Sequence, residues 1–119
     1  MQNLNKTTLK LLETLELAGI TFIQDYIQLL FDNFTLNTYT LPIVKVQNKI
    51  VVSTDFGYYD TLCALINKKV ISAYEDKEEE KIIIKFENNI DLFVSLKDED
   101  RQCAEAAMLF EQGHIWEVW

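Results

Sequence analysis

The 119-residue sequence is poor in glycine, proline, cysteine and histidine, with three, one, two and one of each. So little glycine leaves hardly any scope for loops that cradle phosphate, and no GxGxxG, P-loop or GxSxG motif is present. Cys63 and Cys103 lie in no metal-ligand spacing, and His114 alone could join them. We therefore expect no zinc site, no disulfide framework and no cofactor, with both thiols reduced and Cys63 buried on the apolar side of a helix.

Basic residues are also scarce, since 11 Lys and Arg stand against 19 Asp and Glu and give a formal net charge of −8. Phosphate contacts need clustered Lys and Arg, so this balance argues against nucleic acid and against an anionic membrane as partner. It favours a basic protein partner. The alternative is that the acidity only keeps the protein soluble.

Long apolar runs are missing as well. No stretch reaches membrane-spanning length, and the opening MQNLNKTTLKLL lacks the basic, long apolar and small-residue regions of a signal peptide. We therefore expect a cytoplasmic protein. A composition of 49% hydrophobic and 25% charged residues over this length fits one globular domain, which we place at residues 1–119.

The run from Lys69 to Leu96 holds three strand-like segments, and the other elements are expected to be arranged around it. Side-chain parity predicts the register of its second hairpin, because a three-residue loop pairs Phe86 with Ile90 and makes one face wholly apolar. We predict a type I turn with a G1 bulge there, with Asn89 at positive φ. The acidic residues Glu75 to Glu80 are expected to form the exposed connection before this hairpin.

The N-terminal part is expected to hold one helix and one hairpin. Apolar spacing predicts an amphipathic helix from Leu4 to Leu17, with Asn5 as its N-cap. A hairpin is expected around Asp32-Asn33, where a two-residue loop pairs Phe31 with Phe34.

Two short helices are expected in the second half. The first covers roughly Gly57 to Ile66, with Asp55 as its cap and Asn67 ending it in the left-handed conformation. The second lies near Asp98 to Cys103, where acidic residues suit a helix N-terminus.

Two regions leave alternatives open. Both runs that flank residues 47–49 are apolar on both faces, so parity does not determine the register of that hairpin. Residues 104–119 fit a helix with a tail or, as we favour, a hairpin around Gln112-Gly113. The hairpin pairs Glu111 with His114, Phe110 with Ile115 and Leu109 with Trp116. The elements together indicate an α+β domain, mostly antiparallel sheet built from hairpins, with an N-terminal helix and one or two short helices packed on it.

No constellation in the sequence carries catalysis. His114 has Glu111 nearby but no serine or cysteine nucleophile associated with it in sequence. The carboxylates at 75–80 and at 98–100 lack the alternation and the glycine of a calcium loop. We expect no enzyme, no metal site and no small-molecule substrate.

Two clusters have the composition of protein-binding surfaces. The first is Asp55-Phe-Gly-Tyr-Tyr-Asp60, which combines aromatic side chains with carboxylates that suit a basic partner. Its predicted contact residues are Asp55, Tyr58, Tyr59 and Asp60, and those of the second cluster are Glu78, Glu79 and Glu80. The alternative for the first cluster is that Phe56 and Tyr59 complete the core.

The second half of the chain also resembles a known family. The residues concerned are Leu62-x-x-Leu65-x-Asn67-x-x-Val70, Ile82 to Phe86, Asn88-Asn89, Leu92-x-Val94 and Glu105-Ala106-Ala107. This layout resembles that of small bacterial immunity proteins of the contact-dependent growth inhibition type, over roughly residues 62–119. It consists of hydrophobic spacing and turn positions, and asparagine stands at Asn67 and Asn89 where such turns usually have glycine.

This resemblance implies a cytosolic protein without enzymatic activity. Such a protein binds the toxic C-terminal domain of one cognate toxin, often a nuclease, and blocks its active site stoichiometrically. No binding residue is transferred by the resemblance. The rival interpretation is an acidic secretion chaperone, usually a homodimer, which keeps an extended segment of an effector protein soluble.

Overall fold

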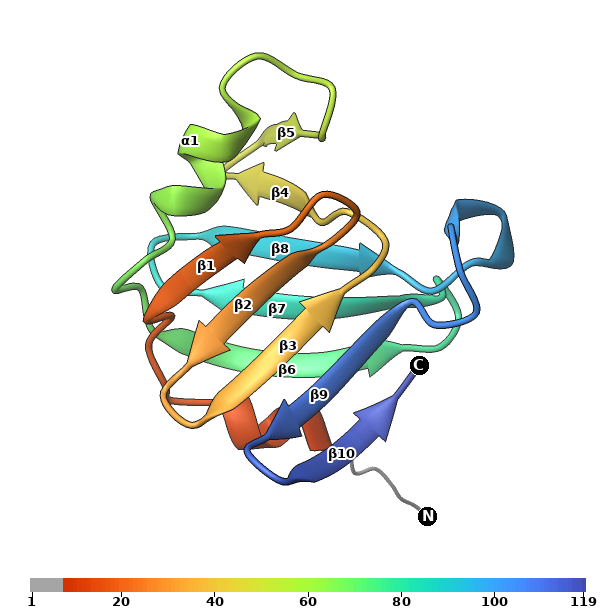
Figure 1. Ribbon diagram of the computed structural model, residues 1–119. Helices are drawn as coiled ribbons and strands as arrows, with labels where there is room; N and C mark the ends of the chain where they lie inside the picture. The colour runs from red at the N-terminus through yellow and green to blue at the C-terminus, as the bar shows by residue number, and fades with distance from the viewer. Residues whose placement is uncertain (1–7) are drawn as a thin grey trace.

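The computed structural model describes residues 8–119 and folds them into two antiparallel sheets that face each other across a shared core (Figure 1). The first sheet holds, in this order, β1 (Gly19–Phe22), β2 (Ile27–Phe31), β3 (Phe34–Thr38), β9 (Ala107–Glu111) and β10 (His114–Val118). The second holds β5 (Lys49–Val51), β4 (Ile43–Val46), β8 (Ile90–Ser95), β7 (Lys81–Phe86) and β6 (Val70–Asp76). The helical segments in this part of the chain are η1 (Thr8–Leu12), α1 (Tyr58–Cys63) and η2 (Asp98–Asp100), of which η1 and η2 are 3₁₀ helices.

The expectation of mostly antiparallel sheet built from hairpins is confirmed, but the chain is mainly β rather than α+β. The predicted N-terminal helix is the main difference. Asn5 and the first residues of that helix lie outside the described residues, and beyond η1 the chain leaves the helical conformation at Thr14, whose φ is 73°. The N–H of Thr14 donates to the carbonyl of Val70 at 2.9 Å, and that of Leu17 donates to the carbonyl of Lys68 at 3.0 Å. Pairing with the start of β6 therefore replaces the last turns of the predicted helix.

One core fills the space between the sheets. Alternation along the strands sends Leu29, Leu36 and Leu109 inward from the first sheet, and Val44, Ile84 and Leu92 inward from the second, all with 0% exposure. Leu9 and Leu12 of η1 and Leu62 of α1 belong to the same cluster. Burial of each such aliphatic side chain stabilises the fold by roughly 1.5–3 kcal/mol.

Both hairpin registers derived from parity are confirmed, with Phe86 opposite Ile90 and Phe31 opposite Phe34. Parity succeeded because only one register of each hairpin pairs apolar residues with each other along the core face, such as Ile84 with Leu92 and Leu29 with Leu36.

The turn predicted between β7 and β8 is only partly right. Asn89 has a positive φ of 61° as predicted, but Asn88 is also left-handed, with a φ of 68°. A type I turn requires a negative φ at that position, so the predicted turn type is wrong. Asparagine is among the residues that tolerate this conformation best, which explains two of them in succession.

Residues 107–118 form the favoured C-terminal hairpin. The confirmed pairs are Glu111–His114 and Phe110–Ile115. The next predicted pair is wrong, because a β-bulge places Leu109 opposite Glu117 instead of Trp116. The carboxylate of Glu117 then accepts a hydrogen bond of 2.5 Å from the hydroxyl of Thr8, while Trp116 is left exposed.

The helix predicted from Gly57 to Ile66 is shortened to α1. Its N-cap is Gly57, with φ 85°, and not Asp55. The Asp55 carboxylate instead accepts a hydrogen bond of 2.9 Å from the N–H of Val52, which closes the turn before the helix. Asn67, with φ 79°, has the predicted left-handed conformation.

The β4–β5 hairpin and η2 are the remaining short elements. The β4–β5 hairpin, whose register the sequence left open, pairs Val46 with Lys49 across a two-residue loop in which Gln47 has a φ of 59°. The helix expected near Asp98 to Cys103 is limited to η2. Across residues 8–119 no helix has the length and apolar character needed to cross a membrane.

Candidate partner-binding surface

The outward face of the second sheet carries a row of apolar side chains across four strands. Ile43 of β4 lies opposite Phe93 of β8, and Phe93 lies opposite Ile83 of β7. Tyr74 of β6 continues the row opposite Ile83. Alternation turns these side chains away from the core residue Leu92, next to Phe93 in the chain. Ile83 is only 6% exposed, while Ile43, Phe93 and Tyr74 are half-buried. The outward face of a sheet is normally polar, so this partly exposed row marks the face as a candidate contact surface.

An open groove of about 540 Å³, which we call the acidic groove, lies along part of this row. Its apolar side chains are Ile43, Ile50 and Phe93. The rest of its lining consists of Glu78, Glu79, Glu80, Lys81, Ser95, Lys97 and Asp100. The groove thus combines an apolar floor with a rim of four carboxylates and two lysines. That composition suits a basic protein segment with an aliphatic or aromatic anchor.

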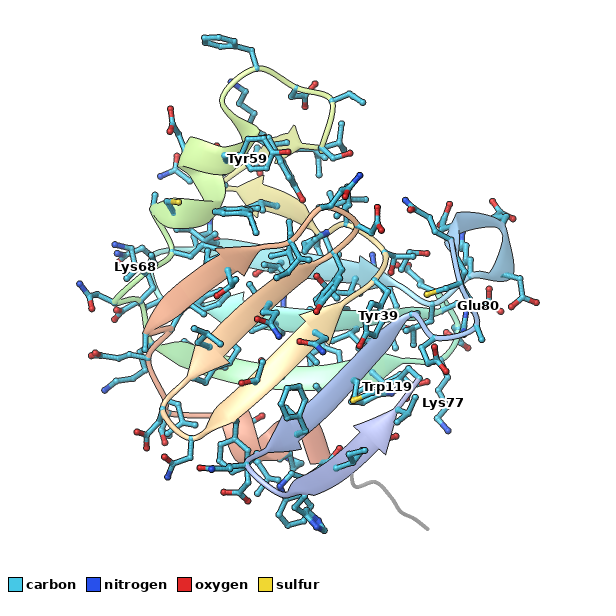
Figure 2. The ribbon with its side chains drawn as sticks, viewed as in Figure 1. Tyr39, Tyr59, Lys68, Lys77, Glu80 and Trp119 are labelled. Carbon is cyan, nitrogen blue, oxygen red and sulfur yellow. The ribbon has the colours of Figure 1, made fainter. Side chains whose placement is uncertain are left out.

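The turn between β6 and β7 holds the three glutamates beside the groove. The N–H of Glu79 donates to Oδ1 of Asp76 at 3.0 Å, and Glu80 has a left-handed φ of 55°. The carbonyl of Glu80 accepts a hydrogen bond of 2.8 Å from the N–H of Leu96, which links the turn to the segment after β8. Figure 2 shows Glu80 at the same edge of the molecule as Trp119, and both line one hollow there.

Lys81 partly neutralises the rim from within the groove. Its Nζ lies 2.8 Å from Oε1 of Glu79 and 4.2 Å from the centre of the Phe93 ring. Elsewhere in the lining of the groove, the carboxylate of Asp100 accepts a hydrogen bond of 2.5 Å from the hydroxyl of Ser95. The structure therefore already holds one cation against the aromatic floor.

The first predicted cluster is divided between core and surface. Tyr58 is 1% exposed, and its hydroxyl donates a hydrogen bond of 2.6 Å to the carbonyl of Pro42. Burial, and to a smaller extent the neighbouring Tyr59, raises the pKa of Tyr58 well above its ordinary value. The prediction of Tyr58 as a partner contact is therefore corrected, because the core uses both its ring and its hydroxyl. Asp60 is exposed, as is Asp55, whose carboxylate bonds the backbone of its own turn.

Three aromatic side chains in this part of the molecule are exposed, and we call them together the aromatic tip: Phe22, Phe56 and Tyr59. Tyr59 is 60% exposed and meets Phe22 edge-on, with ring centres 5.1 Å apart. Phe56 is fully exposed at 106%. The alternative that Phe56 and Tyr59 complete the core is therefore wrong. In Figure 2 Tyr59 lies near the top of the molecule beside α1, away from Glu80.

Strand β5 lies between these two surfaces. Ile50 lines the acidic groove, whereas its neighbours Lys49 and Val51 line a separate hollow together with Asp55 and Phe56. The structure thus gathers the predicted Glu78 to Glu80 in one groove and places Tyr59 and Asp60 in the other region. The three residues of β5 thus contribute to the acidic groove and to the hollow beside Phe56.

Sequence reasoning missed the apolar floor of the groove. The alternation in IDLFVS shows that Phe93 has the opposite parity to the core residues Leu92 and Val94, and this was the available signal. The partnership of Ile43 with Phe93 has no local signal, because β4 and β8 are distant in the chain.

In the described part of the chain, the histidine, the cysteines and the other acidic side chains lie outside these two surfaces or form no cluster. Across residues 8–119 no three His, Cys, Asp or Glu side chains are grouped so that they could hold a metal ion. His114 packs edge-on against Trp116 with ring centres 4.4 Å apart, and Glu111 accepts a hydrogen bond of 3.1 Å from the Trp116 indole. The prediction that Cys63 is buried is wrong, since the thiol is exposed and Leu62 occupies the core side of α1.

Comparison with known proteins gives no match: no protein-family model, no curated protein and no solved structure matches the chain.

Proposed function

We propose that this protein is a non-enzymatic binding protein that holds a basic protein partner against the acidic groove. The observation that carries the proposal is the apolar floor of Ile43, Ile50 and Phe93 bordered by Glu78 to Glu80 and Asp100. Carboxylates on a rim accelerate the encounter with a basic surface, whereas desolvated aromatic and aliphatic side chains hold the complex once formed. The groove supplies both kinds of group at one place.

The aromatic tip enlarges this surface. A stable protein interface buries about 800 Å² on each partner, which is more than one groove of this kind presents. Tyr59, Phe56 and Asp60 lie across β5 from the groove, and exposed tyrosine beside a carboxylate is a typical anchor for a basic partner. A folded partner domain contacts both regions in this proposal, whereas a short peptide contacts the groove alone.

The cellular role we propose is that of a cytosolic immunity protein, which neutralises a cognate toxin domain by stoichiometric binding. The resemblance over residues 62–119, the formal charge of −8 and the acidic groove support this role. A nuclease domain would be a suitable partner, because its substrate-binding face needs Lys and Arg to contact phosphate and is therefore basic. A rim of carboxylates is electrostatically complementary to such a face.

A secretion chaperone is the alternative role. The openness of the groove favours it, since an extended basic segment of an effector also fits along an open groove. The two roles differ in the state of the partner, which is a folded domain for an immunity protein and an unfolded segment for a chaperone.

The test uses the gene immediately upstream of this one. If it encodes a large secreted protein, its C-terminal domain is produced in cells with and without this protein. The immunity proposal expects growth to be rescued, and the purified folded domain to form an equimolar complex. Binding of an unfolded effector segment but not of a folded domain would favour the chaperone instead.

A variant of the aromatic tip tests how the complex is held. Tyr59→Ala should accelerate dissociation of the partner domain. If Tyr59 is a central anchor, the binding free energy should weaken by about 2 kcal/mol. The control is Ile71→Ala, another strongly exposed apolar residue that belongs to neither surface. An unchanged dissociation rate for Tyr59→Ala would show that the aromatic tip is not part of the interface, and the acidic groove alone would remain as the proposed contact surface.

A further inference from the structure

We infer that Lys81 occupies, within the free protein, the position that an arginine of the partner takes in the complex. This inference rests on the proposed function, because it concerns what the acidic groove binds. The ammonium group of Lys81 lies 4.2 Å from the centre of the Phe93 ring and 2.8 Å from the carboxylate of Glu79. An aromatic face beside a carboxylate is a binding site for a cation.

The contacts of Lys81 are of a kind that a competing cation can replace. The side chains of Lys81 and Glu79 are 27% and 63% exposed, and partly solvated ion pairs of this sort contribute little to stability. Lysine carries its charge on a flexible four-carbon chain, so the ammonium can move into water while the backbone of β7 stays in place. Glu79 exchanges one cation for another and is never left without a counter-charge.

Arginine is the side chain that gains most from this exchange. A guanidinium is planar, so it stacks on the Phe93 ring and still donates several hydrogen bonds at its edge. Glu78, Glu79 and Glu80 lie on the rim of the same groove, and a planar fork can reach a carboxylate bidentately. An ammonium group makes the electrostatic contact without the stacking or the fork.

Lys97 provides a matched control. It lines the same groove and carries the same charge, but within residues 8–119 its ammonium group has no ion pair and lies over no ring. Lys81→Ala and Lys97→Ala therefore remove the same charge from the groove, and only Lys81→Ala uncovers Phe93. Lys81→Met removes the charge but leaves a side chain of similar length over the ring.

The experiment measures binding of a fluorescent nona-arginine peptide to the full chain at low ionic strength, with a nona-lysine peptide as the second probe. Lys97→Ala and Lys81→Met should strengthen binding of nona-arginine by similar factors, through charge alone. Lys81→Ala should strengthen it by roughly a further two- to fivefold, the range expected for a cation–π contact. In a Phe93→Leu background this additional gain should disappear, and thermal unfolding confirms that each variant is folded.

The outcomes separate this inference from the proposed function. If the wild-type protein binds nona-arginine in the groove but Lys81→Ala gains no more than Lys97→Ala, the inference about Lys81 is overturned and the groove stands. If the additional gain is as large for nona-lysine, the assignment of arginine is overturned. If neutralising Glu78, Glu79 and Glu80 leaves the binding of nona-arginine unchanged, the proposed binding site itself is wrong.

Discussion

The hydroxyl of Tyr58 donates a hydrogen bond of 2.6 Å to the backbone carbonyl of Pro42, so the first residue of α1 is bonded to the chain just before β4. Tyr58→Phe keeps the ring in the core and leaves the buried carbonyl without this donor. The free energy of unfolding should fall by about 1–3 kcal/mol, as measured by urea denaturation. Tyr59→Phe is the matched control and should change it by less than about 0.5 kcal/mol, because Tyr59 is exposed. Equal effects of the two substitutions would contradict the assignment of Tyr58 to the core.

The same hydroxyl predicts a dependence of stability on alkaline pH. Burial, with a smaller effect of Tyr59, raises the pKa of Tyr58 in the folded protein above that of the unfolded chain, so the folded state holds the phenolic proton more tightly. The stabilisation is complete below the unfolded value of about 10 and is lost as the pH rises above it. The difference in unfolding free energy between wild type and Tyr58→Phe should therefore narrow between about pH 9 and pH 11. A constant difference over that range would argue against a buried neutral phenol.

The loop between β7 and β8 predicts that alanine, but not glycine, is destabilising at two neighbouring asparagines. Asn88 and Asn89 both have positive φ, of 68° and 61°, so alanine is strained at either position. Asn88→Ala and Asn89→Ala should each lower the free energy of unfolding by about 1 kcal/mol, whereas glycine at the same positions should not. Asn33 of the β2–β3 turn has no positive φ, so Asn33→Ala serves as the control. A loss as large at Asn33 would show that the effect is not conformational.

The exposed thiols give a prediction that reverses the one made from the sequence. Cys63 and Cys103 are both free and exposed, so a thiol reagent such as DTNB should label both in the native protein without denaturant. Cys63→Ser should remove one equivalent of reaction and leave the unfolding temperature nearly unchanged, because no core contact is lost. Labelling of Cys63 only after unfolding would show that the side chain is buried after all.

The rim of the groove predicts that two variants with the same net charge differ in association rate, according to where the charges were removed. Neutralising Glu78, Glu79 and Glu80 to glutamine should slow association with a basic partner and flatten its dependence on salt. A control variant neutralises the exposed Glu16, Asp25 and Asp32, which line no part of the groove, and it changes the net charge by the same amount. The control should have a much smaller effect when association rates are measured by stopped flow. Equal slowing would mean that the total charge acts, and that the groove has no special role.

Local sequence pattern was sufficient to predict strand pairing where the paired residues lie close together in the sequence. The pairing of Phe86 with Ile90 follows from parity across one short loop. Asn67 is left-handed as predicted, because asparagine tolerates positive φ, but α1 already ends at Cys63, so the predicted end of the helix at Asn67 is wrong. Parity did not predict the bulge at Trp116, because it assumes an unbroken ladder of pairs; in the folded protein Glu117 lies opposite Leu109 and bonds Thr8, which is far away in the chain.

The features that the sequence did not predict depend on contacts between residues that are far apart in the chain. The chain at Thr14 and Leu17 has helix-like spacing, but its hydrogen bonds go to residues 68–70, so tertiary pairing overrides helical propensity. The floor of the groove was missed for the same reason, since Ile43 and Phe93 become neighbours only when β4 pairs with β8. The acidic rim was predictable from Glu78 to Glu80 as a run of charge, but its position beside that floor was not.

The most direct measurement of the central claim follows the amide chemical shifts of ¹⁵N-labelled protein while the nona-arginine peptide is added. We predict that the largest changes fall on residues 43–50, 78–81 and 93–100, which surround the acidic groove, and that amides near Glu16, Asp25 and Asp32 move little. Changes spread equally over all acidic turns, or centred away from Phe93, would contradict the account.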